Sequence, residues 1–273
     1  MNEKPILFNA EMVNAILSGR KTQTRRIMKV QPSNDFYPLS CAGEIDFDAR
    51  WYCPGVVDKD GYLQPAKKDV YGVANEDEGY ICPLGAIGDQ LWVRETFALL
   101  GNEDGVCIDW EENLIKGDEQ AAARIYKASC EQKHGDYGLY SIPDSAYWKP
   151  DTTNMKYGGS WRPSIHMPRW ASRINLLITG VRVERLQDIS EQDAMAEGIT
   201  AKEVIIETRY EGGGHVEITA DRFFFVGGDD EGYESAGEAF AELWDSIYGQ
   251  KEGESWQANP WVWVIEFERM EAK

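Results

Sequence analysis

Residues 19–26, with the sequence GRKTQTRR, gather basic and hydroxyl side chains that can do chemistry together. A threonine hydroxyl becomes a nucleophile only when a neighbouring base removes its proton, and a lysine is such a base only when its ammonium form is destabilised. Three arginines lie close to Lys21 in the sequence, and repulsion between like charges lowers the pKa of a lysine. Because Lys21 and Thr24 are three residues apart, a turn would bring them into contact. They are a candidate base and nucleophile.

The distribution of charge favours a small anion-binding site over an extended surface that follows a nucleic-acid backbone. The sequence has 28 Lys and Arg against 47 Asp and Glu, and its formal net charge is -19. Residues 1–30 nevertheless carry six basic against two acidic side chains, and residues 161–185 carry five against one. Duplex DNA is bound by cationic surfaces that displace its counterions, so this acidic chain is a poor match for it. A focused phosphate site, in which Lys21 and the arginines bind without catalysis, is the alternative to the nucleophile.

The sequence predicts neither a metal site nor a cofactor. The five cysteines contain no C-x-x-C pair and the three histidines lie far apart, so zinc is not expected. An odd number of cysteines and the absence of an apolar run of membrane-spanning length are typical of a protein in a reducing compartment. We therefore expect a cytoplasmic location and no contact with a membrane.

The basic segment directly follows a predicted helix. Residues 5–9 are short and apolar, as in a strand, and residues 10–18 have the apolar periodicity of a helix. Asn9 is the expected N-cap of this helix and Gly19 its C-terminal stop. The segment from Gly19 onwards thus leaves a helix end, where loops often carry functional side chains.

Further strands and helices are predicted along the chain. Ser190 and Asp193 form a capping box at the start of a short helix that ends near Gly198. Residues 31–87 lack a clear pattern and are expected to be an irregular insertion. The other predicted elements are strands at 88–99, 123–129, 173–186 (divided or bent at Gly180) and 260–270, a hairpin at 205–226 and a helix at 236–249.

Two further side chains are candidates for contact with a substrate. Glu95 falls on the same face of its predicted strand as Leu91, so we expect it to be buried and to need a partner such as Arg26. Trp161 has the flat ring that stacks on an unpaired base, although most tryptophans belong to the core. A structural role, in a salt bridge or in the core, is the alternative for each.

The spacing G-x-K-x-x-x-x-R of Gly19, Lys21 and Arg26 resembles the signature of the ASCH domain, a relative of the RNA-binding PUA fold. The segments GDQLWVRE, LQDISEQDAMAEGI and NPWVWVIEFE are similar to later motifs of that family, and WRPSIHMPRWASRI resembles a phage and prophage subgroup. The resemblance implies an α+β fold with a PUA-like antiparallel β-barrel. It also implies one domain over residues 1–273, with insertions near 31–87, 100–160 and 201–232.

An activity is implied by the same resemblance. Small bacterial ASCH proteins that remove the acetyl group from N4-acetylcytidine use a lysine, a threonine and a glutamate, which fall here on Lys21, Thr24 and Glu197. Glu197 would act as general acid or base on the leaving amine or on an attacking water. The implied partner is a modified nucleoside or a short single-stranded RNA. The residues implied to line its pocket are Gly19, Arg20, Arg26, Glu95 and Trp161.

Two other functions remain open on this sequence. The first is a non-catalytic module that binds RNA or a modified nucleotide in the same pocket. It stays open because proteins that share a fold need not share an activity. The second is a phage accessory protein that binds a host protein through its acidic surface. Glu197 also has a simpler interpretation, as an ordinary exposed residue at a helix end.

Overall fold

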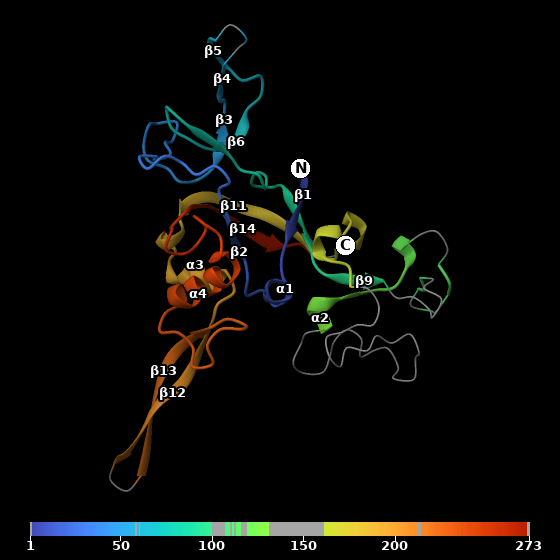
Figure 1. Ribbon diagram of the computed structural model, residues 1–273, viewed down its shortest axis with the longest axis vertical. Coiled ribbons are helices and arrows are strands. Elements are labelled where there is room, and N and C mark those ends of the chain that lie inside the picture. The colour runs from blue at the N-terminus through green and yellow to red at the C-terminus, as the bar shows by residue number, and fades with distance from the viewer. Residues whose placement is uncertain are drawn as a thin grey trace. The chain divides into compact units, whose positions relative to one another are not determined.

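The computed structural model describes residues 2–57, 59, 61–99, 107–109, 111, 113–115, 119–130, 161–211 and 214–271. Strands predominate over helices in this part of the chain, which confirms the predicted α+β class. The helices are α1 (Ala10–Leu17), α2 (Lys127–Cys130), α3 (Glu191–Ala196) and α4 (Ala236–Tyr248). The strands are β1 (Glu3–Leu7), β2 (Gln23–Ile27), β3 (Arg50–Tyr52), β4 (Gly55–Val57), β5 (Leu63–Pro65), β6 (Val70–Ala74), β7 (Gly79–Ile81), β8 (Gln90–Arg94), β9 (Phe97–Leu99), β10 (Arg124–Tyr126), β11 (Asn175–Arg185), β12 (Thr200–Glu211), β13 (Gly214–Phe224) and β14 (Trp261–Arg269) (Figure 1).

The largest sheet has five strands in the order β1-β8-β11-β14-β2, and this order is open over the described residues. Its last two strands, β14 and β2, are antiparallel. The smaller sheets are β3-β6-β7 and the pairs β4-β5, β9-β10 and β12-β13. None of the described helices is long and apolar enough to cross a membrane.

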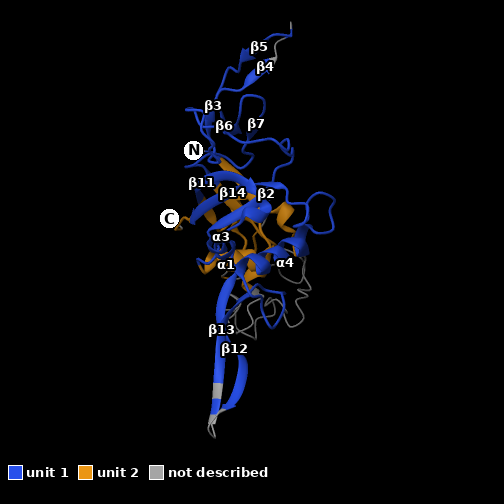
Figure 2. Ribbon diagram, turned by 90° about the vertical axis from the view of Figure 1, so that its left-hand side faces the viewer, with its two compact units in different colours: residues 1–2, 19–90, 177–268 blue, residues 3–18, 91–176, 269–273 orange. Residues whose placement is uncertain are grey.

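The chain divides into two compact units, each assembled from separate stretches of sequence (Figure 2). Unit 1 consists of residues 1–2, 19–90 and 177–268, and unit 2 consists of residues 3–18, 91–176 and 269–273. The basic segment, α3, α4 and the hairpin of β12 and β13 all belong to unit 1. The prediction of one domain interrupted by insertions stays a prediction.

Elements with strong local signals form where the sequence predicts them. The side chain of Asn9 accepts a hydrogen bond from the backbone N–H of Met12 and begins α1, and Ser190 begins α3 in the same way. The predicted hairpin at 205–226 is β12 and β13, and the closing strand is β14. The strand predicted at 173–186 is β11, which continues through Gly180. A Cβ at Gly180 would lie 2.5 Å from the carboxylate of Glu266, so a larger residue there would require the Glu266 side chain to move.

Four predictions of local structure were wrong. The strand predicted at 123–129 covers only β10, because α2 begins at Lys127. Residues 31–87 are not irregular, because they contain β3 to β7; most of these strands have only three residues, too few to show an alternating pattern. The segment around Thr24 was predicted as a turn. It is strand β2, whose polar sequence QTRRI lacks the apolar alternation by which a strand is predicted. The strand predicted at 88–99 is interrupted after Arg94 and resumes as β9. The predicted insertion at 100–160 lies largely outside the described residues.

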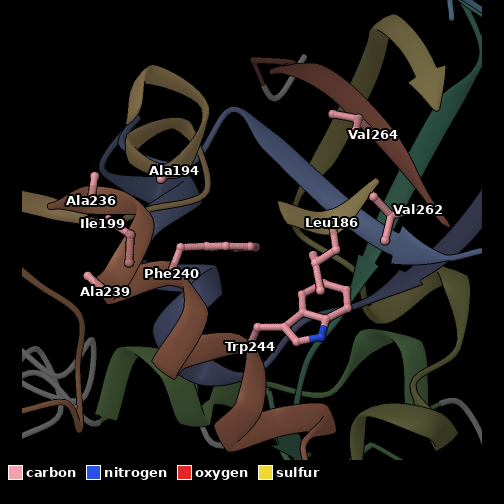
Figure 3. Packing of buried hydrophobic residues seen from close by; sticks show 9 residues of the cluster. All are labelled: Leu186, Ala194, Ile199, Ala236, Ala239, Phe240, Trp244, Val262 and Val264. Atoms are coloured by element: carbon pink, nitrogen blue, oxygen red, sulfur yellow. The ribbon is translucent and has the colours of Figure 1, made fainter. Parts of the chain in front are cut away.

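One apolar cluster in unit 1 fixes α3 and α4 against β14 (Figure 3). Phe240 and Trp244 of α4 supply its largest side chains, and both are buried. The other members are Leu186, Ala194, Ile199, Ala236, Ala239, Val262 and Val264. Because burial of such side chains is the main driving force for packing, this cluster determines where the end of α3 lies beside β2.

Candidate functional site

The register of β2 decides which of its side chains face α3. In the pairing of β14 with β2, Arg25 lies opposite Val264 and Thr24 opposite Ile265. Val264 belongs to the cluster beneath α3 and α4, so Arg25 points to the same side. Because successive side chains of a strand point to opposite faces, Thr24 is on the other face of β2.

The end of α3 is held against the residues that precede β2. The backbone N–H of Thr22 donates to the carbonyl of Ala196 at 2.9 Å. Glu197 is the C-cap of α3, and Gly198 follows with a φ of 112°, in the region that favours glycine. This arrangement places Glu197 beside Lys21, 176 residues away in the sequence.

Lys21 and Glu197 form a buried ion pair. Lys21 Nζ donates to the Glu197 carboxylate Oε2 at 2.5 Å and to its backbone carbonyl at 2.9 Å. The side chains are only 1% and 4% exposed. Burial lowers the pKa of Lys21 below its ordinary value of 10.5, and this outweighs the opposing effect of the Glu197 carboxylate. The positive charges of Arg26 and Arg25 lower the Lys21 pKa further.

Arg25 holds the second oxygen of the Glu197 carboxylate. Its Nη1 donates to Glu197 Oε1 at 3.1 Å, and its Nε donates to Glu184 Oε1 at 2.8 Å. Its Nη2 lies 3.4 Å from Asp193 Oδ2, and the whole side chain is inaccessible to solvent. Arg25 therefore fixes the Glu197 carboxylate in the orientation that presents Oε2 to Lys21.

A second arginine extends this network along β11. Arg182 Nη2 lies 3.0 Å from Asp193 Oδ2, its Nε lies 3.3 Å from Glu184 Oε2, and its Nη1 bonds to Glu266. Burial alone would raise the pKa of Asp193, but Arg182 and Arg25 outweigh burial and lower it. We call the connected set the charge cluster; its members are Lys21, Arg25, Arg182, Glu184, Asp193, Glu197 and Glu266.

The charge cluster neutralises its own cations. It contains three cations and four carboxylates, and each of the three cations is within salt-bridge distance of at least one carboxylate. A phosphate bound by Lys21 or Arg25 would have to displace a buried carboxylate, which then loses its partner. Binding of a phosphate at Lys21 or Arg25 would therefore require these ion pairs to break.

The other predicted residues of unit 1 have contacts of their own. Gly19 has a φ of 75° directly after the C-cap of α1, as a helix stop requires. Arg20 Nη1 reaches the carbonyl of Gly198 at 3.4 Å, and Arg26 Nη1 lies 3.5 Å from the Tyr248 hydroxyl. Thr24 is buried in β2, and its role as nucleophile stays a prediction.

The remaining predicted residues, Glu95 and Trp161, belong to unit 2. Glu95 is buried, and Arg173 Nε and Nη2 donate to its two oxygens at 2.8 and 2.9 Å. The expectation of Arg26 as its partner was wrong, because this bidentate pair already satisfies the carboxylate. Arg173 also packs over the ring of Tyr126 at 4.1 Å. Trp161 is half-buried, and its contact with a substrate stays a prediction.

Sequence reasoning missed most of the charge cluster. Arg182 and Glu184 are two residues apart in a strand, which places them on one face, and this spacing was a usable signal. Asp193 was noticed only for its place in the capping box. Nothing local to β2 indicates that Arg25 rather than Arg26 faces α3, because the register is set by β14.

No group of His, Cys, Asp or Glu able to hold a metal ion occurs in the described part of the chain. In comparisons with family models, with curated proteins and with solved structures, the chain gave no match.

Proposed function

We propose that this protein is an amidohydrolase of the ASCH type, with the PUA-like barrel of that family, acting on an N-acylated nucleoside such as N4-acetylcytidine. The observation that carries the proposal is the buried contact of 2.5 Å between Lys21 Nζ and Glu197 Oε2. A lysine with a lowered pKa is suited to be a base, and a carboxyl group beside it is suited to exchange protons with a leaving amine.

The charge balance of the cluster supports an uncharged acyl group as the target. Because carboxylates already neutralise Lys21 and Arg25, the cluster offers little attraction to an anion. Proton transfer from Lys21 to Glu197 converts the ion pair into a neutral amine and a carboxylic acid without changing the number of protons. Burial disfavours the charged form of Lys21, since desolvation penalises charge. The pair would thus supply a base and an acid together.

The proposed reaction uses that proton pair in two stages. In the first, Lys21 takes the proton of the Thr24 hydroxyl, the oxygen attacks the acyl carbon, and Glu197 donates a proton to the amine as the C–N bond breaks. Because Thr24 lies on the face of β2 opposite Arg25, this stage requires its side chain to turn towards Lys21. In the second, the carboxylate of Glu197 takes a proton from water, the hydroxide attacks the acyl ester, and Lys21 returns its proton to the Thr24 oxygen as the ester bond breaks. The products are the free nucleoside and the carboxylic acid.

The test is release of cytidine from N4-acetylcytidine, followed by chromatography. Wild type should release cytidine, and Lys21→Ala, Thr24→Ala and Glu197→Gln should each lose about 10²–10⁴-fold in rate, the usual contribution of acid–base groups. The double variant Lys21→Ala, Thr24→Ala should be hardly slower than either single variant, because residues that act as a unit are not additive.

The matched control is Lys251→Ala. Lys251 forms a Lys–Glu pair with Glu254 at 3.2 Å, but its side chain is 61% exposed, so its loss should leave the rate unchanged. Absence of cytidine release by the wild type would overturn the proposal. Saturable binding of the nucleoside without release would instead support a binding module.

A further inference from the structure

A long two-stranded ribbon extends from unit 1. Strands β12 and β13 pair antiparallel from Thr200 with Phe224 to Glu211 with Gly214 (Figure 1). At roughly 3.3 Å per residue such a ribbon reaches about 40 Å. Its base is anchored, because Phe223 packs against the apolar cluster beneath α4. An isolated two-stranded ribbon is marginally stable in water. A ribbon of this length is therefore better explained by a function than by a contribution to stability.

The register separates the ribbon into two faces. We define the outer face by the residues that the pairing and the alternation of side chains place together: Glu203, Ile205, Thr208, Tyr210, His215, Glu217, Thr219 and Asp221. All eight are exposed. On the opposite face of β13, Ile218, Ala220 and Arg222 are only partly exposed. The bulge between Ile205 and Glu207 adds one unpaired residue to β12, so that the paired side chains of β12 and β13 still lie on the same faces on both sides of it.

Charge is segregated between the two faces. The outer face carries three carboxylates, Glu203, Glu217 and Asp221, and its residues include neither lysine nor arginine. The ribbon's cations lie on the opposite face and have partners there. Arg209 pairs with Glu207 at 2.7 Å, Lys202 lies over the ring of Phe224 at 5.1 Å, and Arg222 lies 3.4 Å from Glu234.

Apolar groups accompany the carboxylates on the outer face. Ile205 is 54% exposed and Tyr210 is 79% exposed. Tyr210 packs against His215 with their ring centroids 4.3 Å apart, which orients the tyrosine ring across the two strands. An exposed tyrosine beside an exposed aliphatic side chain is typical of a protein-binding surface, where aromatic residues are enriched.

We propose that the outer face of the β12–β13 ribbon binds a partner protein that presents lysine or arginine side chains together with apolar ones. Charge complementarity selects this occupant. The three carboxylates repel the phosphates of a nucleic acid. They also disfavour a second copy of the chain, because a two-fold interface would bring this same acidic surface against itself. A basic, partly apolar segment neutralises the carboxylates and covers Ile205 and Tyr210.

The probe for this proposal is a capped ten-residue peptide of alternating valine and lysine, compared with one of alternating valine and glutamate. Binding to the full chain is measured by fluorescence anisotropy, and NMR amide shifts locate the bound peptide. The lysine peptide should bind about tenfold or more tightly than the glutamate peptide, as expected for three exposed charge pairs. The amide shifts should map to β12 and β13.

Variants then separate the outer face from general acidity. The triple variant Glu203→Gln, Glu217→Gln, Asp221→Asn should weaken the lysine peptide by about tenfold. The control Asp229→Asn, Asp230→Asn, Glu231→Gln removes the same charge from an exposed loop that is not part of the outer face, and should leave the affinity within about twofold. Tyr210→Ser should also weaken binding, with the fold checked by circular dichroism.

Equal effects of the two triple variants would overturn the proposal, as would amide shifts outside the ribbon. Tighter binding of a single-stranded RNA than of the lysine peptide would overturn it in favour of a nucleic acid. Self-association of the wild type that the outer-face variant abolishes would overturn it in favour of a second copy. None of these outcomes depends on whether the chain hydrolyses an acylated nucleoside.

Discussion

The charge cluster and the outer face of the ribbon use the same carboxylate chemistry in opposite environments. In the cluster, Glu197 is buried and each of its oxygens bonds to a different cation. On the outer face, Glu217 is exposed and no lysine or arginine shares its face. A buried charge without a partner is strongly destabilising, whereas an exposed one is solvated by water. Complete pairing therefore marks an internal network, and carboxylates left without cations on their own face mark a surface that can accept an external partner.

The largest expected effect comes from removing the arginine at the centre of the cluster. Arg25→Ala leaves Glu184, Asp193 and Glu197 with a missing cation, and should cost about 3–5 kcal/mol of unfolding free energy, as for other broken buried pairs. Urea unfolding measures this. The control is Arg209→Ala, which breaks the exposed pair with Glu207 and should cost about 1 kcal/mol or less. Equal losses in the two variants would contradict the contrast between buried and exposed pairs.

A smaller effect is expected from the pH dependence of the Lys21 pair. The folded protein releases the Lys21 proton at a lower pH than the unfolded chain, whose lysine has the ordinary value of 10.5. Between these two values the unfolded state binds more protons, so stability should rise with pH. Lys21→Met should lack this rise, which urea unfolding from about pH 7 to about pH 10.5 will show. An identical dependence in both proteins would assign the rise to other groups.

Asp193 should give a change of the same sign at acidic pH, a rise of stability with pH. Because its folded pKa is lowered below the ordinary 3.8, its contribution to stability is present above that value. It is lost as pH falls through the lowered pKa. Asp193→Asn should remove this part of the acid sensitivity, and thermal unfolding between about pH 2 and about pH 5 is the measurement. Acid unfolding that is the same in the variant would mean that Arg182 and Arg25 do not stabilise the charged form of Asp193.

The smallest effect on stability is expected at the outer face. Glu203→Gln, Glu217→Gln and Asp221→Asn together should change the unfolding free energy by about 0.5 kcal/mol or less, because exposed charges contribute little. A slight gain is consistent with relief of repulsion among the three carboxylates. A loss as large as that of Arg25→Ala would show that these carboxylates stabilise the fold, which would contradict their proposed role in binding a partner.

The sequence predicted the elements whose signals are local. Asn9 and Ser190 begin helices through their own side chains, and the ribbon is visible as two β-rich runs around a glycine-rich turn. Strand β2 was missed because the side chains that it buries are Gln23, Thr24 and Arg25. Burial of such polar residues depends on packing against α3, which comes from a distant part of the sequence.

The candidate site divides in the same way. Family resemblance pointed to Lys21 and Glu197, and the structure places them in direct contact. The partner of Glu95 was misassigned because many arginines were available and only the tertiary fold selects Arg173. Arg25 was not distinguished from Arg20 and Arg26, because neighbouring arginines are alike in sequence and differ only in the direction in which they point.

The measurement that tests the central claim most directly is the pH dependence of kcat/KM for N4-acetylcytidine. If Lys21 and Glu197 are the acid–base centre, kcat/KM of the wild type should rise with pH through a pKa below 10.5, because the lysine must lose its proton to act as a base. In Lys21→Met the rise and most of the activity should be absent. Turnover by Lys21→Met at the wild-type rate, with the same pH profile, would contradict the assignment.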